Sequence, residues 1–392
     1  MATVIARFPV ETAMTSTRRL LIAGAPRSAS SLPIARLLTG LLFAVVAVAC
    51  GDAGPTGVDG GDRTDDLICD LDRNLLVSET SPGAIPAITE PPMVTQGEPG
   101  ALYLNDDERV LGVVVNGSAR AYPHAVLDHH EVINDRIDGE WFTVTFCPLT
   151  GSGLRLDPNL GAERLDVAVS GLLFANNLVL YDRASGDVYG PQLAVAGTCS
   201  RFRNQSLTLL PLVEMSWGEW KALYPATLVV SSATGFNRNY LQSPYEEYRG
   251  DEDLLHDMPV DRSRPLKERV LAIRLGDDSG IGFPFGELSA ALGSEGVLNQ
   301  AVGGVPTSVF YQADDGETAI AFYSTVGSQA LTFSASSDGT FTDAETGSTW
   351  RLDGRAIAGP LVGEQLQVRE DAFVVYWFAW RHFQPSAEVW TG

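Results

Sequence analysis

Short apolar runs separated by turn residues fill most of the chain beyond residue 110 and predict a β-rich fold. Asn116-Gly117 stands between two such runs, which is the strongest short-range signal for a β-hairpin. Asp138-Gly139 divides the next apolar segment in the same way and predicts a second hairpin. Further strands are expected at 153–156, 165–170, 178–181 and 227–231.

Two short helices complete the predicted pattern of the first half. Residues 125–130 follow Pro123 and are expected to form one of them. Residues 216–223 have amphipathic helical spacing and end before Pro225, which cannot continue a helix. Many strands with a few helices indicate the α+β class.

The second half of the chain repeats motifs of the first. Residues 108–111 (Glu-Arg-Val-Leu) recur as residues 268–271, an offset of 160 positions (268 − 108 = 160). The same offset relates two tryptophans and a proline to later counterparts: Trp217 to Trp377, Trp220 to Trp380 and Pro225 to Pro385. We therefore predict a tandem duplication that gives two homologous β-rich units, at 81–234 and 268–392, joined by a polar connector at 235–267.

The repeat provides an internal control on which positions serve the fold. The matching tryptophans and prolines are expected to be packing residues. His129, His130 and Cys147 are not repeated, because Ser289-Ala290-Ala291 stands near the first two positions and Tyr311 stands opposite Cys147. The first unit is therefore expected to carry any site, and the second to be a degenerate copy that completes the scaffold.

Composition and charge limit the classes of function. The 392 residues are 45% hydrophobic and 19% charged, which is ordinary for a folded globular protein. The formal net charge of −22 argues against nucleic-acid binding, because phosphates would be repelled over the whole surface.

The N-terminus predicts export. Arg18, Arg19, Arg27 and Arg36 precede an apolar run at 37–49 that is too short for a membrane span, which is typical of a signal peptide covering 1–49. Cys50 follows Ala47-Val48-Ala49, a sequence similar to a bacterial lipobox, so we expect a lipid on Cys50 that anchors the protein to a membrane; a plain cleavable signal is the alternative. Residues 50–80 are expected to form a tether and the segment that leads into the first unit. The protein is expected on the periplasmic or outer-surface side of the cell envelope.

Seven segments, in this order along the chain, identify a known family: DDERVLGVVVNGSARAYP, HEVIND, VTFCPLTGS, SGLLFANNLVLYDR, GFNRNY, PYEEY and YWFAWRHFQP. Together they resemble the bacterial proteins of the domain-of-unknown-function 3179 family, over about residues 81–390. The resemblance implies an exported bacterial protein, often a lipoprotein. It implies no reaction.

The chain departs from the family pattern in two places that bear on chemistry. The family usually has Trp-His-Glu where this chain has His129-His130-Glu131, and Cys-Pro-Leu-Cys where it has Cys-Pro-Leu-Thr at 147–150. A dithiol chemistry would therefore lack its second thiol, since Thr150 stands in that place. Cys69 and Cys199 lie outside the family's usual cysteines, so we expect them to form a disulfide that leaves Cys147 as the remaining thiol.

A metal site is the first candidate chemistry. His130 and Cys147 are ligands that suit copper or zinc, and His129 is a candidate third ligand. No spacing in the chain matches a known zinc motif. A hydrogen-bonded histidine and a buried, inert cysteine are the alternative.

A thiol-dependent enzyme is the second candidate, with Cys147 as the nucleophile and His130 as its base. Glu131, Thr150 and Asn176-Asn177 would then orient the histidine or a small ligand. The third candidate is a non-enzymatic, surface-tethered binding or assembly module. The sequence favours a site around His130 and Cys147 that binds a metal or a small ligand outside the cytoplasm, and it names no substrate or protein partner.

Overall fold

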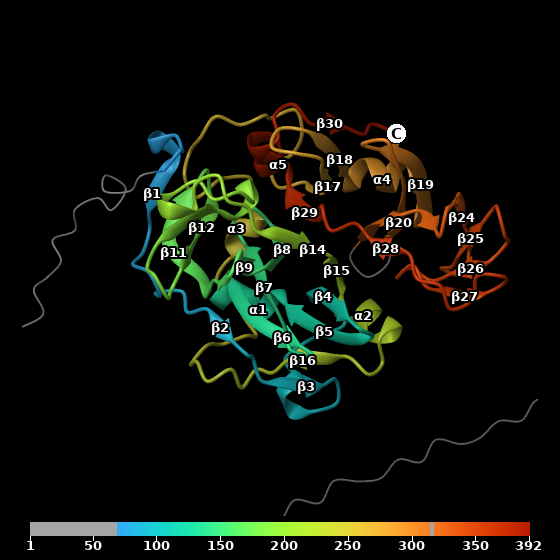
Figure 1. The fold of residues 1–392 in the computed structure, drawn as a ribbon, viewed down its shortest axis with the longest axis horizontal. Helices are drawn as coiled ribbons and strands as arrows, with labels where there is room; N and C mark the ends of the chain where they lie inside the picture. Colours follow the sequence, from blue (N-terminus) through green and yellow to red (C-terminus); the bar gives the residue numbers. More distant parts are fainter. Residues whose placement is uncertain (1–68, 314–316) are drawn as a thin grey trace, which may run out of the picture. The chain divides into compact units, whose positions relative to one another are not determined.

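The computed structural model describes residues 69–313 and 317–392, and its fold is β-rich with few helices, as the α+β class predicted (Figure 1). The predicted signal peptide, Cys50 and most of the expected tether lie outside the described residues. Within the described residues, no helix combines the length and the apolar character that crossing a membrane requires.

The first predicted hairpin is the centre of a five-stranded sheet. β4 (Arg109–Val115) pairs with β5 (Ser118–Pro123), and Asn116 and Gly117 have φ of 50° and 81°, the positive values that a type I′ turn requires. The other strands are β15 (Val213–Ser216), β16 (Leu228–Val230) and β3 (Met93–Thr95). The sheet order is β15-β4-β5-β16-β3.

Helix α2 (Trp217–Leu223) follows β15 directly and packs against β4 and β5. Ser216 caps it, because its hydroxyl accepts a hydrogen bond from the backbone N of Glu219 while the Glu219 carboxylate accepts one from the backbone N of Ser216. Trp220 is fully buried against Gly112, where a Cβ atom would clash with the indole ring. This packing fixes α2 on the sheet.

The second predicted hairpin, which turns at Asp138 and Gly139, is the centre of another five-stranded sheet. In sheet order its strands are β14 (Thr208–Leu210), β8 (Ser152–Asp157), β7 (Glu140–Cys147), β6 (Val132–Ile137) and β2 (Ile88–Thr89). Helix α1 (His124–His130) leads from β5 to β6 and begins one residue earlier than expected.

A third sheet is flanked in sequence by the two cysteines of the disulfide. Its strands, in order, are β1 (Leu76–Ser78), β11 (Val167–Phe174), β12 (Asn177–Asp182) and β13 (Val188–Pro191). The disulfide joins Cys69, before β1, to Cys199, after β13, which is the pairing expected from the sequence.

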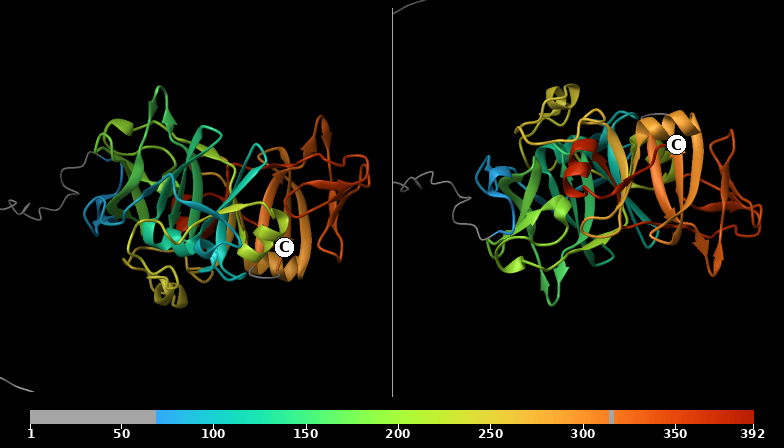
Figure 2. Two further views of the ribbon diagram at one scale, coloured as in Figure 1. Left: turned by 90° about the horizontal axis from the view of Figure 1, so that it is seen from below. Right: turned by 90° about the horizontal axis from the view of Figure 1, so that it is seen from above.

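The second half contributes two four-stranded sheets and a smaller group of strands. In sheet order, the strands of the first are β29 (Ala372–Tyr376), β17 (Arg269–Arg274), β18 (Gly280–Pro284) and β30 (Glu388–Val389). The strands of the second are β19 (Glu295–Val302), β20 (Val305–Gln312), β21 (Thr318–Tyr323) and β28 (Gln367–Val368). Helix α4 (Phe285–Leu292) packs on β17, β18 and β19, and α5 (Trp377–Phe383) follows β29 (Figure 2). The smaller sheet is β24 (Phe333–Ala335), β25 (Phe341–Asp343), β26 (Thr349–Trp350) and β27 (Ala356–Ala358), with β24 against β19.

The connector at 235–267 packs on the first half and contains helix α3 (Glu246–Gly250). Arg249 of this helix makes a two-pronged ion pair with Asp128 of α1, with N···O distances of 2.5 and 2.8 Å. The Tyr248 hydroxyl donates to the carbonyl oxygen of Leu149 at 2.8 Å. The polar residues that predicted a linker therefore fasten this segment to the first half.

Both halves contribute to one hydrophobic core. Leu154 of β8 belongs to the same buried cluster as Val270 of β17 and Trp377 of α5. The backbone N of Tyr376 donates to the carbonyl oxygen of Thr150 at 2.8 Å, so β29 lies against the loop between β7 and β8. This contact brings the second half next to the segment that holds Cys147.

Candidate functional site

Cys147 ends β7, and its thiol is enclosed. The residue is 1% exposed, its Sγ accepts a hydrogen bond from the backbone N of Leu178 at 3.4 Å, and the thiol lies 3.6 Å from the carbonyl oxygen of Asn176. Burial, with a smaller contribution from Glu131, raises the pKa of the thiol to about 11. Such a thiol is almost entirely protonated at neutral pH, and the thiolate is the form that acts as nucleophile and metal ligand.

Glu131 is a buried carboxyl group beside this thiol. It follows α1 in the left-handed region (φ 58°), which is uncommon for residues other than glycine. Burial raises its pKa to about 8, although a hydrogen bond from the Tyr245 hydroxyl at 3.0 Å acts in the opposite direction. Glu131 is therefore mostly protonated at neutral pH and does not supply a base for Cys147.

Thr150 and Asn177 belong to a buried polar network behind the β7–β8 loop. The Asn177 amide donates to Thr150 Oγ1 at 3.0 Å and to Gln192 Oε1 at 3.1 Å. Ser152 Oγ donates to the same Gln192 oxygen at 2.9 Å and lies 2.8 Å from Thr150 Oγ1. These groups satisfy one another, and they connect the β7–β8 loop to Asn177 of β12.

His130 and His129 face the connector. Nδ1 of His130 lies 2.7 Å from the carbonyl oxygen of Pro86, and Nε2 lies 2.7 Å from the Tyr240 hydroxyl. Burial lowers the pKa of His130. Nε2 of His129 lies 3.1 Å from the carbonyl oxygen of Gln242. Both histidines therefore hold the connector in place.

The structure does not assemble the His/Cys site expected from the sequence. His130 is directed to Pro86 and Tyr240, whereas Cys147 is directed to β12. In the two described ranges, no three or more His, Cys, Asp or Glu side chains are grouped so that they could hold a metal ion. The described residues therefore give no support to the copper or zinc site expected from His129, His130 and Cys147, because the histidines contact the connector and Pro86 while the thiol contacts β12.

Asn176 fastens the connector. Its amide donates to the carbonyl oxygen of His256 at 2.9 Å, and its Oδ1 accepts from the backbone N of His256 at 2.8 Å. The side chain of Asn176 therefore binds the connector and not Cys147. The contact between Asn176 and the Cys147 thiol is made by the backbone carbonyl oxygen of Asn176.

A cavity of about 400 Å³ lies beside the β7–β8 loop, and sequence reasoning missed it. Both halves line it, with Asp107, Glu108, Arg109, His124, Phe146, Gly151, Glu214, Arg249, Arg269 and Tyr376. Convergent polar groups in a concave site are the usual mark of a ligand-binding site. The second half was expected to be scaffold only, yet it supplies Arg269 and Tyr376.

Glu214 links two of the arginines in this cavity. Its Oε1 lies 2.8 Å from Arg109 Nε and 3.2 Å from Arg269 Nη2. Burial opposes ionisation of Glu214, but the adjacent cations, Arg109 foremost, hold its pKa below the usual value. Burial, and then the charge of Arg109, lowers the pKa of Arg269 to about 10, so the two guanidinium groups lie close enough to repel each other.

His124, the first residue of α1, lines the same cavity. Its ring stacks on Phe146 with a centroid distance of 4.1 Å. Burial lowers its pKa to about 4, so the imidazole is neutral at neutral pH. Its Nε2 is buried and has no hydrogen-bond partner in the part of the chain that the structure describes; Glu214 Oε2 is 4.0 Å away, beyond hydrogen-bond distance.

Tyr376 closes the cavity against the β7–β8 loop. Its ring packs on Gly151, where an added Cβ would come within 2.6 Å of the ring and where φ is 58°. A side chain at Gly151 would therefore displace the tyrosine. The charge of Arg249 in α3 acts on its hydroxyl and opposes the rise in the tyrosine pKa that burial causes, so the connector reaches the cavity wall.

One signal in the sequence pointed to this cavity. Arg109 and Arg269 are the repeated arginines of the Glu-Arg-Val-Leu motif, at the starts of β4 and β17. The repeat was used only as evidence of duplication, and the arginines were given no role. Their charge, repeated in both halves, was the available indication of a site.

Searches of curated proteins and of solved structures found no match. A family model described as "Protein of unknown function (DUF3179)" matches residues 82–387, nearly the span over which the resemblance was noted. The chain belongs to this family.

Proposed function

We propose that this protein binds a small ligand through an anionic group of that ligand, in the cavity around Arg109, His124 and Arg269. The observation that carries the proposal is the buried Nε2 of His124, which lacks a hydrogen-bond partner in the described residues and borders a cavity lined by three arginines. A buried polar atom without a partner costs about 1–3 kcal/mol, which a ligand hydrogen bond would recover.

The lining indicates the chemistry of the ligand. Guanidinium groups match the two oxygens of a carboxylate or the oxygens of a phosphate, and the Tyr376 hydroxyl lies beside Arg249 as a further polar group. The exposed Asp107 and the half-buried Glu108 line the same cavity and suit a cationic group on the same ligand. The class is therefore a small carboxylate or phosphate, with room for an ammonium group.

Ligand binding fits this geometry better than thiol or metal chemistry. The raised pKa of Cys147 and the protonated state of Glu131 leave the thiol without an activating base. His130, the expected base, has both ring nitrogens engaged elsewhere. A thiol-dependent enzyme is therefore not the function that we propose.

The test is ligand binding by the full chain, followed as a shift of the unfolding midpoint at constant ionic strength. Phosphate, acetate and glycine are the probes, and chloride is the control. We expect at least one probe to stabilise the fold, by about 2.7 kcal/mol at 100 times its Kd. A complete lack of stabilisation by all three probes would refute the proposal.

Three variants locate the site. Arg269→Gln and Tyr376→Phe should each weaken binding roughly tenfold, because each removes a hydrogen-bond donor from the cavity. Arg262→Gln, at an exposed arginine outside the cavity lining, is the matched control and should leave binding unchanged. Equal binding by wild type and both cavity variants would place the ligand elsewhere and contradict the proposal.

We further propose that the protein is exported and carries a lipid on Cys50. The support is the apolar run at 37–49 and the lipobox-like residues 47–49 that precede the cysteine. Cells fed a clickable palmitate analogue should label the wild-type chain and not Cys50→Ala, and the variant should leave the membrane fraction. Label retained by Cys50→Ala would contradict the anchor.

We also infer that the two halves arose by tandem duplication. The strand orders β15-β4-β5-β16 and β29-β17-β18-β30 correspond, as do β14-β8-β7-β6 and β28-β21-β20-β19. Arg109 pairs with Ser216, and Arg269 pairs with Tyr376. These pairings support the inference, because both members of the second pair lie 160 positions after those of the first (269 − 109 = 160; 376 − 216 = 160). An experimental structure in which these eight strand pairs fail to superpose would contradict it.

A further inference from the structure

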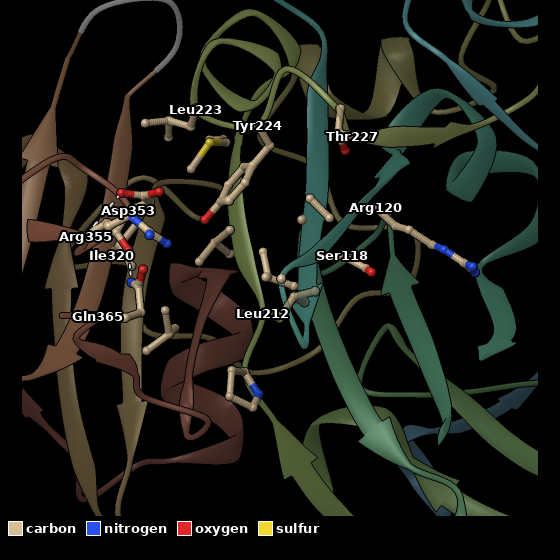
Figure 3. A pocket seen from close by; sticks show the side chains of 18 of the residues that line it. Ser118, Arg120, Leu212, Leu223, Tyr224, Thr227, Ile320, Asp353, Arg355 and Gln365 are labelled. Atoms are coloured by element: carbon tan, nitrogen blue, oxygen red, sulfur yellow. Dashed lines mark hydrogen bonds between the residues drawn. The ribbon is translucent and has the colours of Figure 1, made fainter. Parts of the chain in front are cut away.

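A second cavity, of about 900 Å³, lies between strands of the first half and strands of the second half (Figure 3). Its walls come from β4, β5, the segment before β15, the turn between α2 and β16, and, in the second half, β21, β28 and residues 351–355. It shares no lining residue with the arginine cavity. Cavities between two packed units are common places for ligands.

Apolar side chains line this cavity from both halves. Leu212 and Leu223 come from the first half, and Ile320 and Val368 come from β21 and β28. Leu212, Leu223 and Val368 are only half-buried, so part of their apolar surface is in contact with water. A ligand that covers this surface gains about 25 cal/mol for each Å² of apolar area removed from water.

Polar side chains gather at one side of the cavity, where Figure 3 shows Asp353, Arg355 and Gln365 near the hydroxyl of Tyr224. Asp353 is buried and ion-paired with Arg351, and its carboxylate also accepts a hydrogen bond from the backbone N of Arg355 at 3.2 Å. The carboxylate of Asp353 is therefore satisfied within the protein.

Arg355 differs from the other cations of this cavity. Its guanidinium group makes no hydrogen bond or ion pair with another side chain in the described ranges, whereas Arg351 is paired with Asp353 and Arg120 with Asp135. One cation thus remains available at the edge of an apolar cavity, in a chain whose net charge is −22. That combination matches a ligand with an apolar body and one anionic head.

We propose that this cavity is a second binding site, which takes an amphipathic monocarboxylate such as a medium-chain fatty acid. The acyl chain lies against Leu212, Leu223 and Ile320, and the carboxylate pairs with Arg355. A cavity of this size accommodates an acyl chain of about ten to twelve carbons. The site is independent of the small-anion site, because its lining and its ligand chemistry are different.

The experiment measures decanoate binding by the full chain, below the micelle concentration, with uncharged 1-decanol as the matched ligand. Isothermal titration calorimetry gives the affinity. Tryptophan fluorescence gives a local signal, because the ring of Trp220 lies 4.4 Å, centroid to centroid, from that of Tyr224 in the cavity. We expect saturable binding of decanoate at one site and weaker binding of decanol.

Two variants test the two ends of the ligand. Leu212→Trp fills the apolar part and should weaken decanoate and decanol alike, by roughly tenfold or more. Arg355→Gln should weaken decanoate about fivefold to tenfold and leave decanol unchanged, because only the charged pair is lost. Arg355 is exposed, so this variant should fold normally; Arg262→Gln is the control for loss of one positive charge.

Three outcomes would overturn the proposal. They are an absence of saturable decanoate binding, decanoate binding that both variants retain at full strength, and decanol bound as tightly as decanoate by the wild type. Circular dichroism of Leu212→Trp establishes that a loss of binding is not a loss of fold.

Discussion

Replacing Glu131 by glutamine should change how the stability of this protein depends on pH. Glu131 keeps its proton to about pH 8 in the folded chain, because burial raises its pKa from the ordinary 4.5. The unfolded chain releases the same proton near pH 4.5. Stability from this group is therefore fully present below pH 4.5 and is lost as pH rises toward 8. The gap between the two pKa values corresponds to about 5 kcal/mol, of which about 4 kcal/mol falls between pH 4.5 and 8.

Glutamine has nearly the same shape, keeps an oxygen for the Tyr245 hydroxyl, and does not titrate. The free energy of unfolding, measured with urea and tryptophan fluorescence from pH 4.5 to 8, should therefore rise in Glu131→Gln relative to wild type by about 4 kcal/mol across this range. The difference between the two proteins at pH 4.5 reports packing alone and is subtracted. The exposed Glu247→Gln controls for loss of one carboxyl group. Parallel profiles of wild type and Glu131→Gln would refute the reasoning.

Three further predictions concern single groups. The Cys147 thiol, buried and with a pKa raised to about 11, should resist iodoacetamide at pH 7.4 until the chain is unfolded; peptide mass spectrometry that finds rapid labelling of the native protein would contradict its enclosure. Replacing Cys69 and Cys199 together by serine should lower the free energy of unfolding by about 3–5 kcal/mol, because the disulfide closes a loop with a sequence separation of 130. An unchanged urea midpoint would argue against the bridge. The His124 imidazole should titrate in NMR with a midpoint near pH 4, and phosphate bound beside the ring should raise that midpoint. A midpoint near 6.5 would show that the ring is solvated.

Local signals predicted much of the first half correctly. The hairpin turns were readable because asparagine, aspartate and glycine tolerate positive φ, and Asn116 and Asp138 have φ of 50° and 52°. The α2 helix was readable from its apolar spacing and from Pro225, and Ser216 caps it. The strand from 165 to 170 was placed too early, because β11 runs from Val167 to Phe174 and its later residues depend on pairing with β1 and β12.

The candidate site was predicted only in part. Cys147, Glu131 and Thr150 do lie together, because Glu131 directly precedes β6, Cys147 ends the paired strand β7 and Thr150 stands in the turn that follows. His130 was expected to join them, but it lies at the end of α1 and is held by Tyr240, which the sequence places 110 residues away. No local pattern could indicate that contact.

The sequence by itself determined the turns, most strand positions, the class of fold and the family, because each depends on residues close together in the chain or on motifs in a fixed order. Only the tertiary structure decided which side chains meet. Arg109, Glu214 and Arg269 come from three strands of two sheets, and their meeting depends on how the halves pack. Cys147 contacts Leu178 of β12 and Glu131 contacts Tyr245 of the connector, and the burial of both groups raises their pKa values. The electrostatic character of the site is thus a property of desolvation and long-range packing, which residue order does not encode locally.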